Sequence, residues 1–400
     1  MIRRSLRIAA WGLSGLAVVL LVAFLWLRDS PYWAGITLFA ESKRVENFRN
    51  MDRVFPYRSV AGSDDVWAFG EEPRPLPLRY RYAGEDRDLA AFLDRTVTTG
   101  LLVVHRGNIV HEEYRLGAGE TSSFTSWSVA KSVLSALIGI AVEEGQIESI
   151  RDPIGRYVPA LAGSAYESVP IEDALTMSSG IAFDEDYDNP LSDVNMLFIT
   201  FATGAPMEAT LAELESLREP GSFNDYISSD SIALGLVLEG ATGLPLDEYL
   251  ETRLWGPMGA EAEAFWSTSR AGQVLPLCCL NATLRDYARF GRLYLEGGAR
   301  GDLQILPPNW IEASVKPTAP HLQPGDNPAS SWTFGYGYKW WIPETPQGDF
   351  LAIGIWGQYV YVDPLREVLV VKASADPGFD ERDHESVAAF RAIAAAVAGE

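Results

Sequence analysis

The sequence contains few residues of the kinds that build metal sites and disulfide frameworks. Its 400 residues include four histidines and only two cysteines, Cys278 and Cys279, which are adjacent. No HExxH or CxxC motif occurs, so a CxxC-type zinc site and a conventional disulfide framework are excluded, and the four histidines leave little for a metal cluster. We therefore expect no metal and no organic cofactor. For the two cysteines we favour a pair of buried thiols between two lobes, and the alternative is a strained vicinal disulfide.

Positive charge is also scarce. The net charge is −22, and only five of the 32 basic residues are lysines. An acidic surface repels phosphate backbones, so nucleic acid is not an expected partner. The chain has no Gly-x-Ser-x-Gly motif, phosphate loop or dinucleotide fingerprint. These absences disfavour an α/β-hydrolase nucleophile elbow and a nucleotide-binding enzyme.

One long stretch of the chain is free of charge. Residues 8–27 carry none, and Arg3, Arg4 and Arg7 precede them. A helix of this length, rising about 1.5 Å per residue, would span a bilayer core of roughly 30 Å. We therefore predict an N-terminal transmembrane anchor at residues 1–30. The positive-inside rule then places the rest of the chain on the periplasmic or extracellular side of the cytoplasmic membrane. A cleaved signal peptide is the alternative.

The remaining chain divides into a lead-in, residues 31–85, and a large domain, residues 86–400. β-Rich runs lie near both ends of this domain, and helical patterns dominate from about residue 150 to residue 330. We therefore predict an α/β (α+β) fold, in which an antiparallel sheet built from both chain ends is flanked by helices and joined by a mostly helical second lobe. The expected strands are residues 101–104, 109–114, 350–355, 358–363 and 368–373.

The pattern Ser-x-x-Lys occurs once in the chain, at Ser128 and Lys131, within an apolar run that predicts a buried helix over residues 128–142. On a helix, residues i and i+3 lie one turn apart on one face, so the amine can reach the hydroxyl. Ser128 would lie at the helix start, where unpaired N–H groups favour an oxyanion. Burial would lower the pKa of Lys131 toward that of a usable base. The pattern alone is common and carries little weight.

A second candidate group follows at Tyr226 and Ser228, within a stretch that Pro220 and Gly221 mark as a loop. Loops often display catalytic side chains. Tyr226 could share a proton network with the amine and hydroxyl of the Ser-x-x-Lys pair. A loop tyrosine that simply packs its ring is the alternative.

Together these residues resemble the serine β-lactamase and penicillin-binding-protein superfamily, which has Ser-x-x-Lys, Tyr-x-Asn/Ser and Lys/His-Ser/Thr-Gly in this order. Within it, the chain is similar to the branch of 6-aminohexanoate-dimer hydrolases and class C-like carboxylesterases. The resemblance extends over most of residues 45–398. Its other matching segments are NFRNMD at 47–52, LTMSSG at 175–180, NATLRDYARFG at 281–291 and GYGYKWW at 335–341.

The resemblance implies a β-lactamase-like fold and a role for each residue of the motifs. Ser128 would be the nucleophile, Lys131 its activating base, and Tyr226 the proton carrier to the leaving group. The backbone N–H groups of Ser128 and Gln358 would bind the oxyanion. Ser228 would belong to the substrate-binding group.

The third motif of the superfamily is altered. Where Lys/His-Ser/Thr-Gly would fall, this chain has Ile355, Trp356 and Gly357. The cation of the motif helps to hold the carboxylate of penicillins and stem peptides, and these side chains offer no charge. We therefore expect uncharged substrates, with Trp356 and Gly357 beside the acyl group. Core packing is the alternative for Trp356.

The sequence thus predicts a membrane-anchored serine hydrolase that cleaves ester or amide bonds of small, uncharged substrates through an acyl-enzyme. Two other functions remain open at this point. One is a β-lactamase or DD-peptidase that recognises penicillin. The other is a binding protein that keeps the fold without catalysis, which the intact Ser128, Lys131 and Tyr226 set disfavours.

Overall fold

The computed structural model describes residue 11, residues 14–22 and residues 35–400. No helix in these stretches is long and apolar enough to cross a membrane, which corrects the prediction of a transmembrane helix. Residues 8–10, 12–13 and 23–27 of the predicted span lie outside the described residues.

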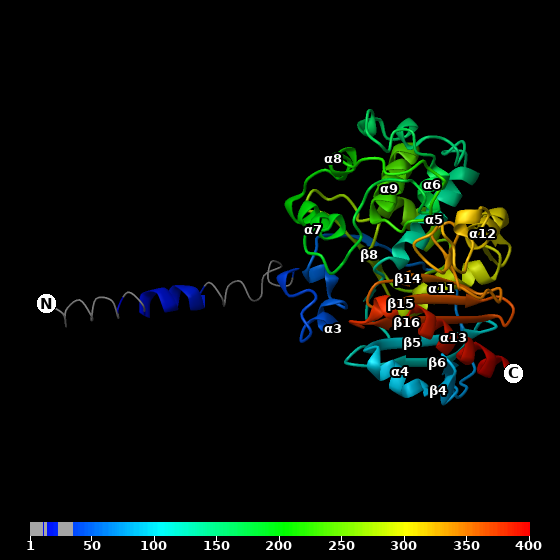
Figure 1. Ribbon diagram of the computed structural model, residues 1–400. Coiled ribbons are helices and arrows are strands. Elements are labelled where there is room, and N and C mark those ends of the chain that lie inside the picture. The colour runs from blue at the N-terminus through cyan, green and yellow to red at the C-terminus, as the bar shows by residue number, and fades with distance from the viewer. Residues whose placement is uncertain (1–10, 12–13, 23–34) are drawn as a thin grey trace.

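An eight-stranded sheet is built from both ends of the domain, as predicted (Figure 1). The C-terminal strand β16 pairs with the N-terminal strand β5, with Val370 opposite Val103. The strand pairs are antiparallel except at one edge of the sheet, where β2 of the lead-in runs parallel to β6. In sheet order the strands are β12 (Gly335–Tyr336), β13 (Trp341–Ile342), β14 (Phe350–Gly354), β15 (Gln358–Asp363), β16 (Val368–Ser374), β5 (Thr98–His105), β6 (Asn108–Tyr114) and β2 (Gly70–Glu71).

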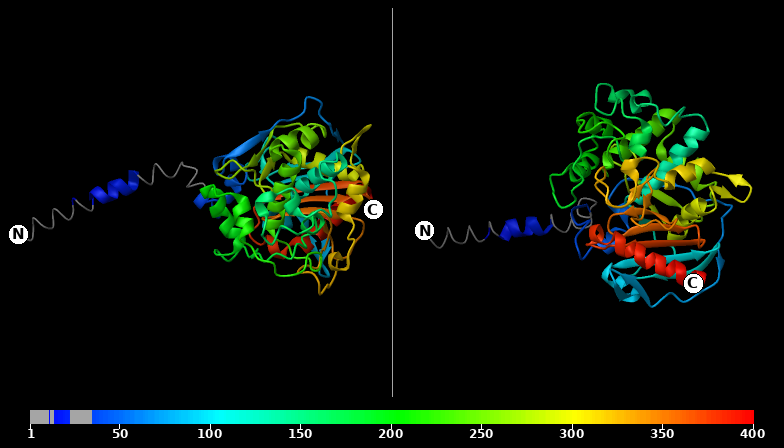
Figure 2. Two further views of the ribbon diagram at one scale, coloured as in Figure 1. Left: turned by 90° about the horizontal axis from the view of Figure 1, so that it is seen from above. Right: turned by 45° about the vertical axis from the view of Figure 1, so that its right-hand side comes forward.

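Helices cover both faces of this sheet, which explains why its central strands read as continuous apolar runs. Leu102 and Val371 face the larger core with helices α5 and α11, whereas Val103 and Val370 face a second core with α4 and α13. Figure 2 shows α13 lying along the sheet at the C-terminus. The helix bounds are α4 (Leu89–Arg95), α5 (Val129–Glu143), α11 (Leu284–Leu295) and α13 (Asp383–Ala398).

The second lobe is mainly helical, but it adjoins a small sheet that the sequence did not predict. That sheet has the order β1-β8-β9-β7 and joins the lead-in to the chain just before α5. The helices of the lobe are α6 (Ile171–Leu175), α7 (Asp193–Thr203), α8 (Met207–Ala212), α9 (Ser228–Thr242) and α10 (Leu246–Leu250). The strands are β1 (Tyr57–Val60), β7 (Phe124–Thr125), β8 (Ala264–Ser267) and β9 (Leu280–Ala282).

Shorter elements complete the described chain. The hairpin of β3 and β4 packs against α13, and α3 belongs to the lead-in. These elements are α3 (Arg44–Asn47), β3 (Arg79–Tyr82), β4 (Glu85–Asp88), β10 (Ala299–Arg300), β11 (Leu303–Gln304) and α12 (Pro308–Val315). Single turns of 3-10 or π helix occur at Met51–Arg53, Ile154–Arg156, Pro159–Leu161, Glu251–Trp255, Pro320–Leu322 and Phe379–Glu381.

Candidate active site

Helix α5 brings the Ser-x-x-Lys pair together. Ser128 is the N-cap of α5, and Lys131 lies in its first turn. Lys131 Nζ donates a hydrogen bond to Ser128 Oγ at 2.8 Å. Lys131 is only 2% exposed and Ser128 only 8%. The amine and hydroxyl are therefore paired in a site from which most water is excluded.

Two further acceptors surround the amine. Lys131 Nζ lies 2.9 Å from the carbonyl oxygen of Leu277 and 3.3 Å from Ser228 Oγ. Ser228 is the first residue of α9, which packs beside α5. The amine is thus held by groups from three separate parts of the chain.

Burial sets the protonation of this amine. It lowers the pKa of Lys131 to about 8, while the negative charge of Glu185 acts in the opposite direction. Burial favours the neutral amine because an ammonium ion loses hydration in an apolar interior. Near neutral pH a useful fraction of Lys131 can therefore accept a proton.

Tyr226 lies over the same amine. The Lys131 ammonium is 5.0 Å from the centre of the Tyr226 ring, and this ring stacks on Trp341 at 5.3 Å. Burial and the charge of Glu185 raise the pKa of Tyr226, and an interaction with the Ser128 hydroxyl opposes the rise. The phenol therefore stays protonated at neutral pH and can act as a proton donor.

Glu185 is a site residue that sequence reasoning missed. Its carboxylate accepts hydrogen bonds from Ser228 N at 2.7 Å and from Ser228 Oγ at 2.6 Å. The Tyr187 hydroxyl donates to the same carboxylate at 2.7 Å. A carboxylate at the start of a helix is stabilised by the helix dipole. The only signal in the sequence was the acidic run at 184–188, which is typical of a solvated loop.

The turn between β14 and β15 carries the altered third motif. Trp356 and Gly357 both have positive φ, 63° and 80°. Ile355 lines the cavity beside Ser128, whereas Trp356, Gly357 and Gln358 do not. Trp356 instead stacks on Phe39 of the lead-in, with 5.5 Å between the ring centres.

The Gln358 side chain bonds to the neighbouring strand. Its Nε2 donates to Ser374 O at 2.8 Å, and Ser374 N donates to its Oε1 at 3.2 Å. Gln358 therefore ties the start of β15 to the end of β16. These bonds involve the side chain, so the role of the Gln358 backbone N–H as an oxyanion donor stays a prediction.

Gly354, at the end of β14, allows this strand to approach Ser128 closely. A Cβ atom there would lie 2.5 Å from Ser126 O and 3.1 Å from Ser128 N. Atoms cannot approach within 3.0 Å in this way without a shift of the backbone. Only glycine therefore lets the strand and the N-terminus of α5 meet here.

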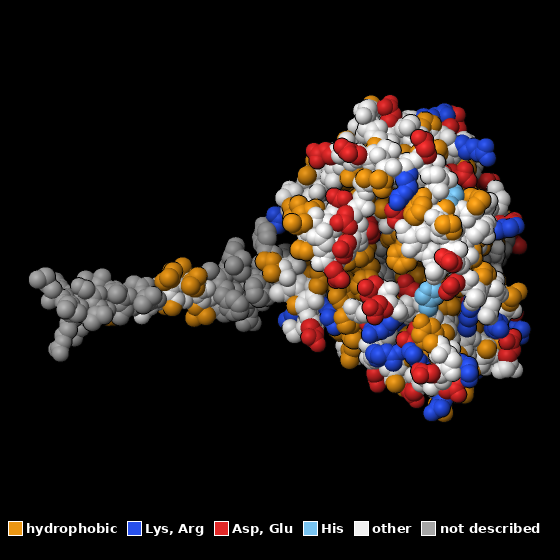
Figure 3. All heavy atoms as spheres, viewed as in Figure 1, with side chains coloured by type: hydrophobic (Ala, Val, Ile, Leu, Met, Phe, Trp, Pro, Cys, Tyr) orange, Lys and Arg blue, Asp and Glu red, His pale blue; other side chains and the backbone are white. Residues whose placement is uncertain are grey.

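The cavity in front of Ser128 has a volume of about 330 Å³. Its floor is aromatic and aliphatic, and no Lys or Arg is found among the described residues that line it. On the face drawn in Figure 3, acidic side chains gather between the upper lobe and the sheet, with hydrophobic side chains beside them. The carboxylates lining the cavity are Asp184, Glu185, Asp186, Asp225, Asp380 and Asp383.

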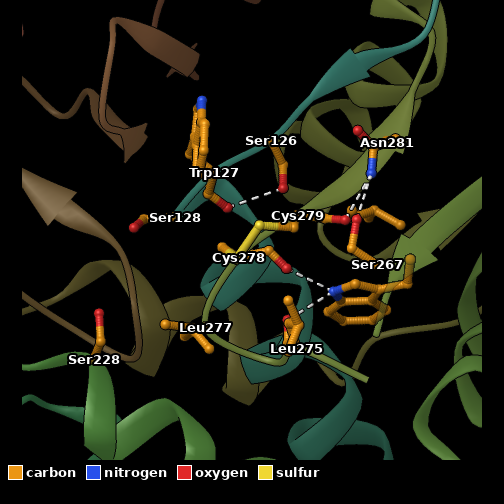
Figure 4. The surroundings of a disulfide bond; sticks show 12 residues. Ser126, Trp127, Ser128, Ser228, Ser267, Leu275, Leu277, Cys278, Cys279 and Asn281 are labelled. Atoms are coloured by element: carbon orange, nitrogen blue, oxygen red, sulfur yellow. Dashed lines mark hydrogen bonds between the residues drawn. A yellow bond between two sulfur atoms is a disulfide. The ribbon is translucent and has the colours of Figure 1, made fainter. Parts of the chain in front are cut away.

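The two cysteines correct a further expectation. They do not remain thiols but form a disulfide between adjacent residues, Cys278 and Cys279 (Figure 4). Cys279 has a φ of 69°, and the tight turn brings the two sulfurs into bonding distance. Within the described ranges, no group of His, Cys, Asp and Glu residues could hold a metal ion.

Comparison with known proteins agrees with this geometry. The Beta-lactamase family model matches residues 86–394. The chain is 30% identical to 6-aminohexanoate-dimer hydrolase of Paenarthrobacter ureafaciens over 303 residues, which cover 74% of this chain and 77% of that protein.

Solved structures show the same fold. A candidate 6-aminohexanoate-dimer hydrolase from Bacillus anthracis matches with a TM-score of 0.81 and 24% identity, over 90% of this chain and 96% of that one. EstCE1, a hydrolase with promiscuous acyltransferase activity, matches with a TM-score of 0.60 and 17% identity, over 76% of this chain and 96% of that one. The family match over residues 86–394 and the 30% identical relative identify the chain as a member of the β-lactamase family, a family of serine hydrolases.

Proposed function

We propose that this protein hydrolyses ester or amide bonds of small, uncharged substrates through an acyl-enzyme on Ser128. The observation that carries the proposal is the 2.8 Å contact between Lys131 Nζ and Ser128 Oγ at the edge of a substrate-sized cavity. A buried amine beside a hydroxyl is the arrangement that activates a serine nucleophile.

The residues suggest an order of events. Neutral Lys131 takes the proton of Ser128 as its oxygen attacks the substrate carbonyl. The N–H of Ser128, at the start of α5, faces the developing oxyanion. Tyr226 passes a proton to the departing alcohol or amine, and water then releases the acyl group.

The second oxyanion donor would come from the turn between β14 and β15. The resemblance to the superfamily points to the N–H of Gln358 for this role. Ile355 lines the cavity where Gln358 does not, so its N–H is an alternative donor in the same turn.

The charge of the cavity supports the choice of substrate. Six carboxylates line it, and an anionic substrate would lose hydration there without gaining a partner. The altered motif at Ile355, Trp356 and Gly357 supplies no cation in its place. Penicillins and stem peptides carry a carboxylate, so a β-lactamase or DD-peptidase function is disfavoured.

A substrate panel tests the proposal on the full-length protein. Short-chain p-nitrophenyl esters, linear amides and a chromogenic cephalosporin are compared, with Ser128→Ala as the control. We expect the esters to be cleaved faster than the cephalosporin, and the variant to be inactive toward all of them. Faster opening of the β-lactam than of any simple ester would contradict the substrate assignment.

Covalent labelling distinguishes an enzyme from a binding protein without catalysis. A fluorophosphonate probe should label the wild-type protein at Ser128 and leave the Ser128→Ala variant unlabelled. Absence of labelling in the folded wild-type protein would favour binding without turnover.

A further inference from the structure

The Cys278–Cys279 disulfide lies in the turn that leads into β9 (Figure 4), and the residue before it, Leu277, contacts Lys131. Two side chains fix this turn. Trp266 Nε1 donates to Cys278 O at 2.7 Å, and Asn281 Nδ2 donates to Cys279 O at 2.7 Å. The disulfide closes a small ring through the peptide bond between the cysteines. This ring restricts backbone torsions that two free thiols would leave open.

The residue before the ring contacts the base. The carbonyl oxygen of Leu277 accepts a hydrogen bond from Lys131 Nζ at 2.9 Å. Leu277 O therefore moves with the peptide that joins it to Cys278. The other carbonyls of the turn face away from the site, toward Trp266 and Asn281.

This carbonyl determines where the lone pair of Lys131 points. A neutral amine has two N–H groups and one lone pair, whereas Lys131 Nζ has three neighbours. Leu277 O can only accept, so it takes one N–H. Ser228 Oγ donates its own proton to Glu185 and so accepts the other N–H. The lone pair is then left for the hydroxyl of Ser128, as proton transfer requires.

We propose that the Cys278–Cys279 disulfide is a positioning element of the active site. It holds the Leu277 carbonyl where that oxygen aims Lys131 at Ser128, and reduction of the disulfide lowers the rate of catalysis. The inference rests on the proposed function, because it takes Lys131 as the base. Neither cysteine lines the substrate cavity, so the loss should fall on kcat and not on KM.

Reduction proceeds by thiol–disulfide exchange with a dithiol. A thiolate of the reagent attacks one sulfur, the S–S bond breaks, and a mixed disulfide forms. The second thiol of the reagent then resolves it. Two electrons and two protons pass to Cys278 and Cys279, and the dithiol becomes a cyclic disulfide. Since the cysteines are only 5% and 0% exposed, the exchange requires transient opening of the turn.

The test compares full-length wild-type protein, before and after dithiothreitol, with a Cys278→Ser/Cys279→Ser variant. Free thiols are counted after each treatment, and kcat and KM for a p-nitrophenyl ester are measured across the pH range. We expect kcat to fall roughly 10- to 100-fold in the variant and in the reduced protein, with KM close to that of wild type. Dithiothreitol should leave the variant unchanged.

The pH profile distinguishes loss of the Leu277 acceptor from opening of the whole site to water. Loss of the Leu277 acceptor destabilises the ammonium form, so the acid limb of kcat should move to lower pH. Opening of the site to water would instead move this limb to higher pH, because hydration restores the ammonium. A limb that moves to higher pH, or a folded variant with wild-type kcat, overturns the proposal.

Two controls keep the outcomes separate. If Ser128→Ala remains active, the serine mechanism fails whatever the cysteines do. If Ser128→Ala is inactive and the cysteine variant is fully active, only the role of the disulfide fails. Should the double serine variant not fold, Cys278→Ala/Cys279→Gly replaces it, because glycine adopts the φ of Cys279 readily.

Discussion

At the scale of single residues, the site depends on a lysine whose charge is suppressed by burial. Lys131 is surrounded by α5, α9 and the turn before β9, and its pKa falls to about 8. The same burial keeps Tyr226 protonated. One apolar environment therefore disfavours the charged form of both Lys131 and Tyr226, and so shifts their pKa values in opposite directions.

Removal of either member of the Ser-x-x-Lys pair should abolish turnover. We expect Ser128→Ala and Lys131→Ala each to lower kcat/KM by about 10³-fold or more, as loss of a nucleophile or its base does elsewhere. Thermal unfolding and circular dichroism establish that each variant is folded. Near-normal activity in a folded Ser128→Ala protein would exclude the mechanism.

The pH dependence should respond to Glu185. Lys131 must be neutral to act as base, so kcat/KM should rise with pH through its pKa of about 8. Glu185 stabilises the ammonium form, and Glu185→Gln should therefore move this limb to lower pH. An unchanged or raised apparent pKa in the variant would show that Glu185 does not act on Lys131.

At the scale of elements, the meeting of β14 with the N-terminus of α5 is the tightest contact of the site. Gly354→Ala would force a Cβ against Ser126 O. We expect kcat to fall at least about tenfold, since small displacements of catalytic groups are costly, and stability to fall by about 1–3 kcal/mol.

Gly119→Ala is the matched control for this substitution, because a Cβ at Gly119 meets no atom within 4 Å. Ester hydrolysis and urea unfolding measure both effects. Wild-type kcat in Gly354→Ala would show that the strand can yield without disturbing Ser128.

The long elements were predictable because their patterns are local. Strands β15 and β16 contain the continuous apolar runs YVYV and VLVV, as strands covered on both faces do, and α5 is a nearly all-apolar helix. The small sheet of β1, β7, β8 and β9 was missed because its strands have only two to four residues. Such short strands are defined by partners far away in the chain.

In the candidate site, too, contacts between residues close in the sequence were predictable, and contacts between distant residues were not. Ser128 and Lys131 lie one helical turn apart, so their contact follows from spacing alone. Glu185 reaches Ser228 across 43 positions, and Leu277 reaches Lys131 across 146. Nothing in the local sequence of Leu277 indicates this contact, since its backbone carbonyl makes it. Trp356, expected beside the acyl group, stacks on Phe39 of the lead-in, which is more than 300 positions away in the sequence.

At the scale of the whole molecule, Glu385 joins segments from both ends of the chain. Its carboxylate accepts hydrogen bonds from Tyr80 at 2.6 Å, Arg87 at 2.6 Å and Arg95 at 2.7 Å. These partners come from β3, β4 and α4, whereas Glu385 lies on α13. The arginines and the tyrosine hold the pKa of Glu385 below its usual range, although burial opposes them.

Glu385→Gln should therefore destabilise the fold by about 2 kcal/mol, a typical loss for hydrogen bonds to a charged group. The pKa of Glu385 is lower in the folded than in the unfolded protein. Its contribution to stability is therefore present above the unfolded pKa and is lost as pH falls through the folded pKa. Urea unfolding at neutral and acidic pH measures both effects. The difference between variant and wild type should shrink in acid.

Glu312→Gln serves as the control, since Glu312 pairs with Lys316 on an exposed surface. Exposed pairs contribute about 0–1 kcal/mol. Equal destabilisation by the two substitutions would show that the Glu385 cluster adds no more stability than an exposed ion pair.

The pairing of β16 with β5 has a consequence for biosynthesis. The central strands of the sheet come from opposite ends of the domain, with Val103 beside Val370. On the ribosome, β5 and the segment bearing Ser128 emerge long before their neighbour in the sheet has been translated. The apolar faces of β5 and α5 then remain exposed to solvent during synthesis. Under this condition nascent chains aggregate or require chaperones. Ser128 is among the earlier residues of the domain to be made, and the sheet that supports it is among the last parts to be completed.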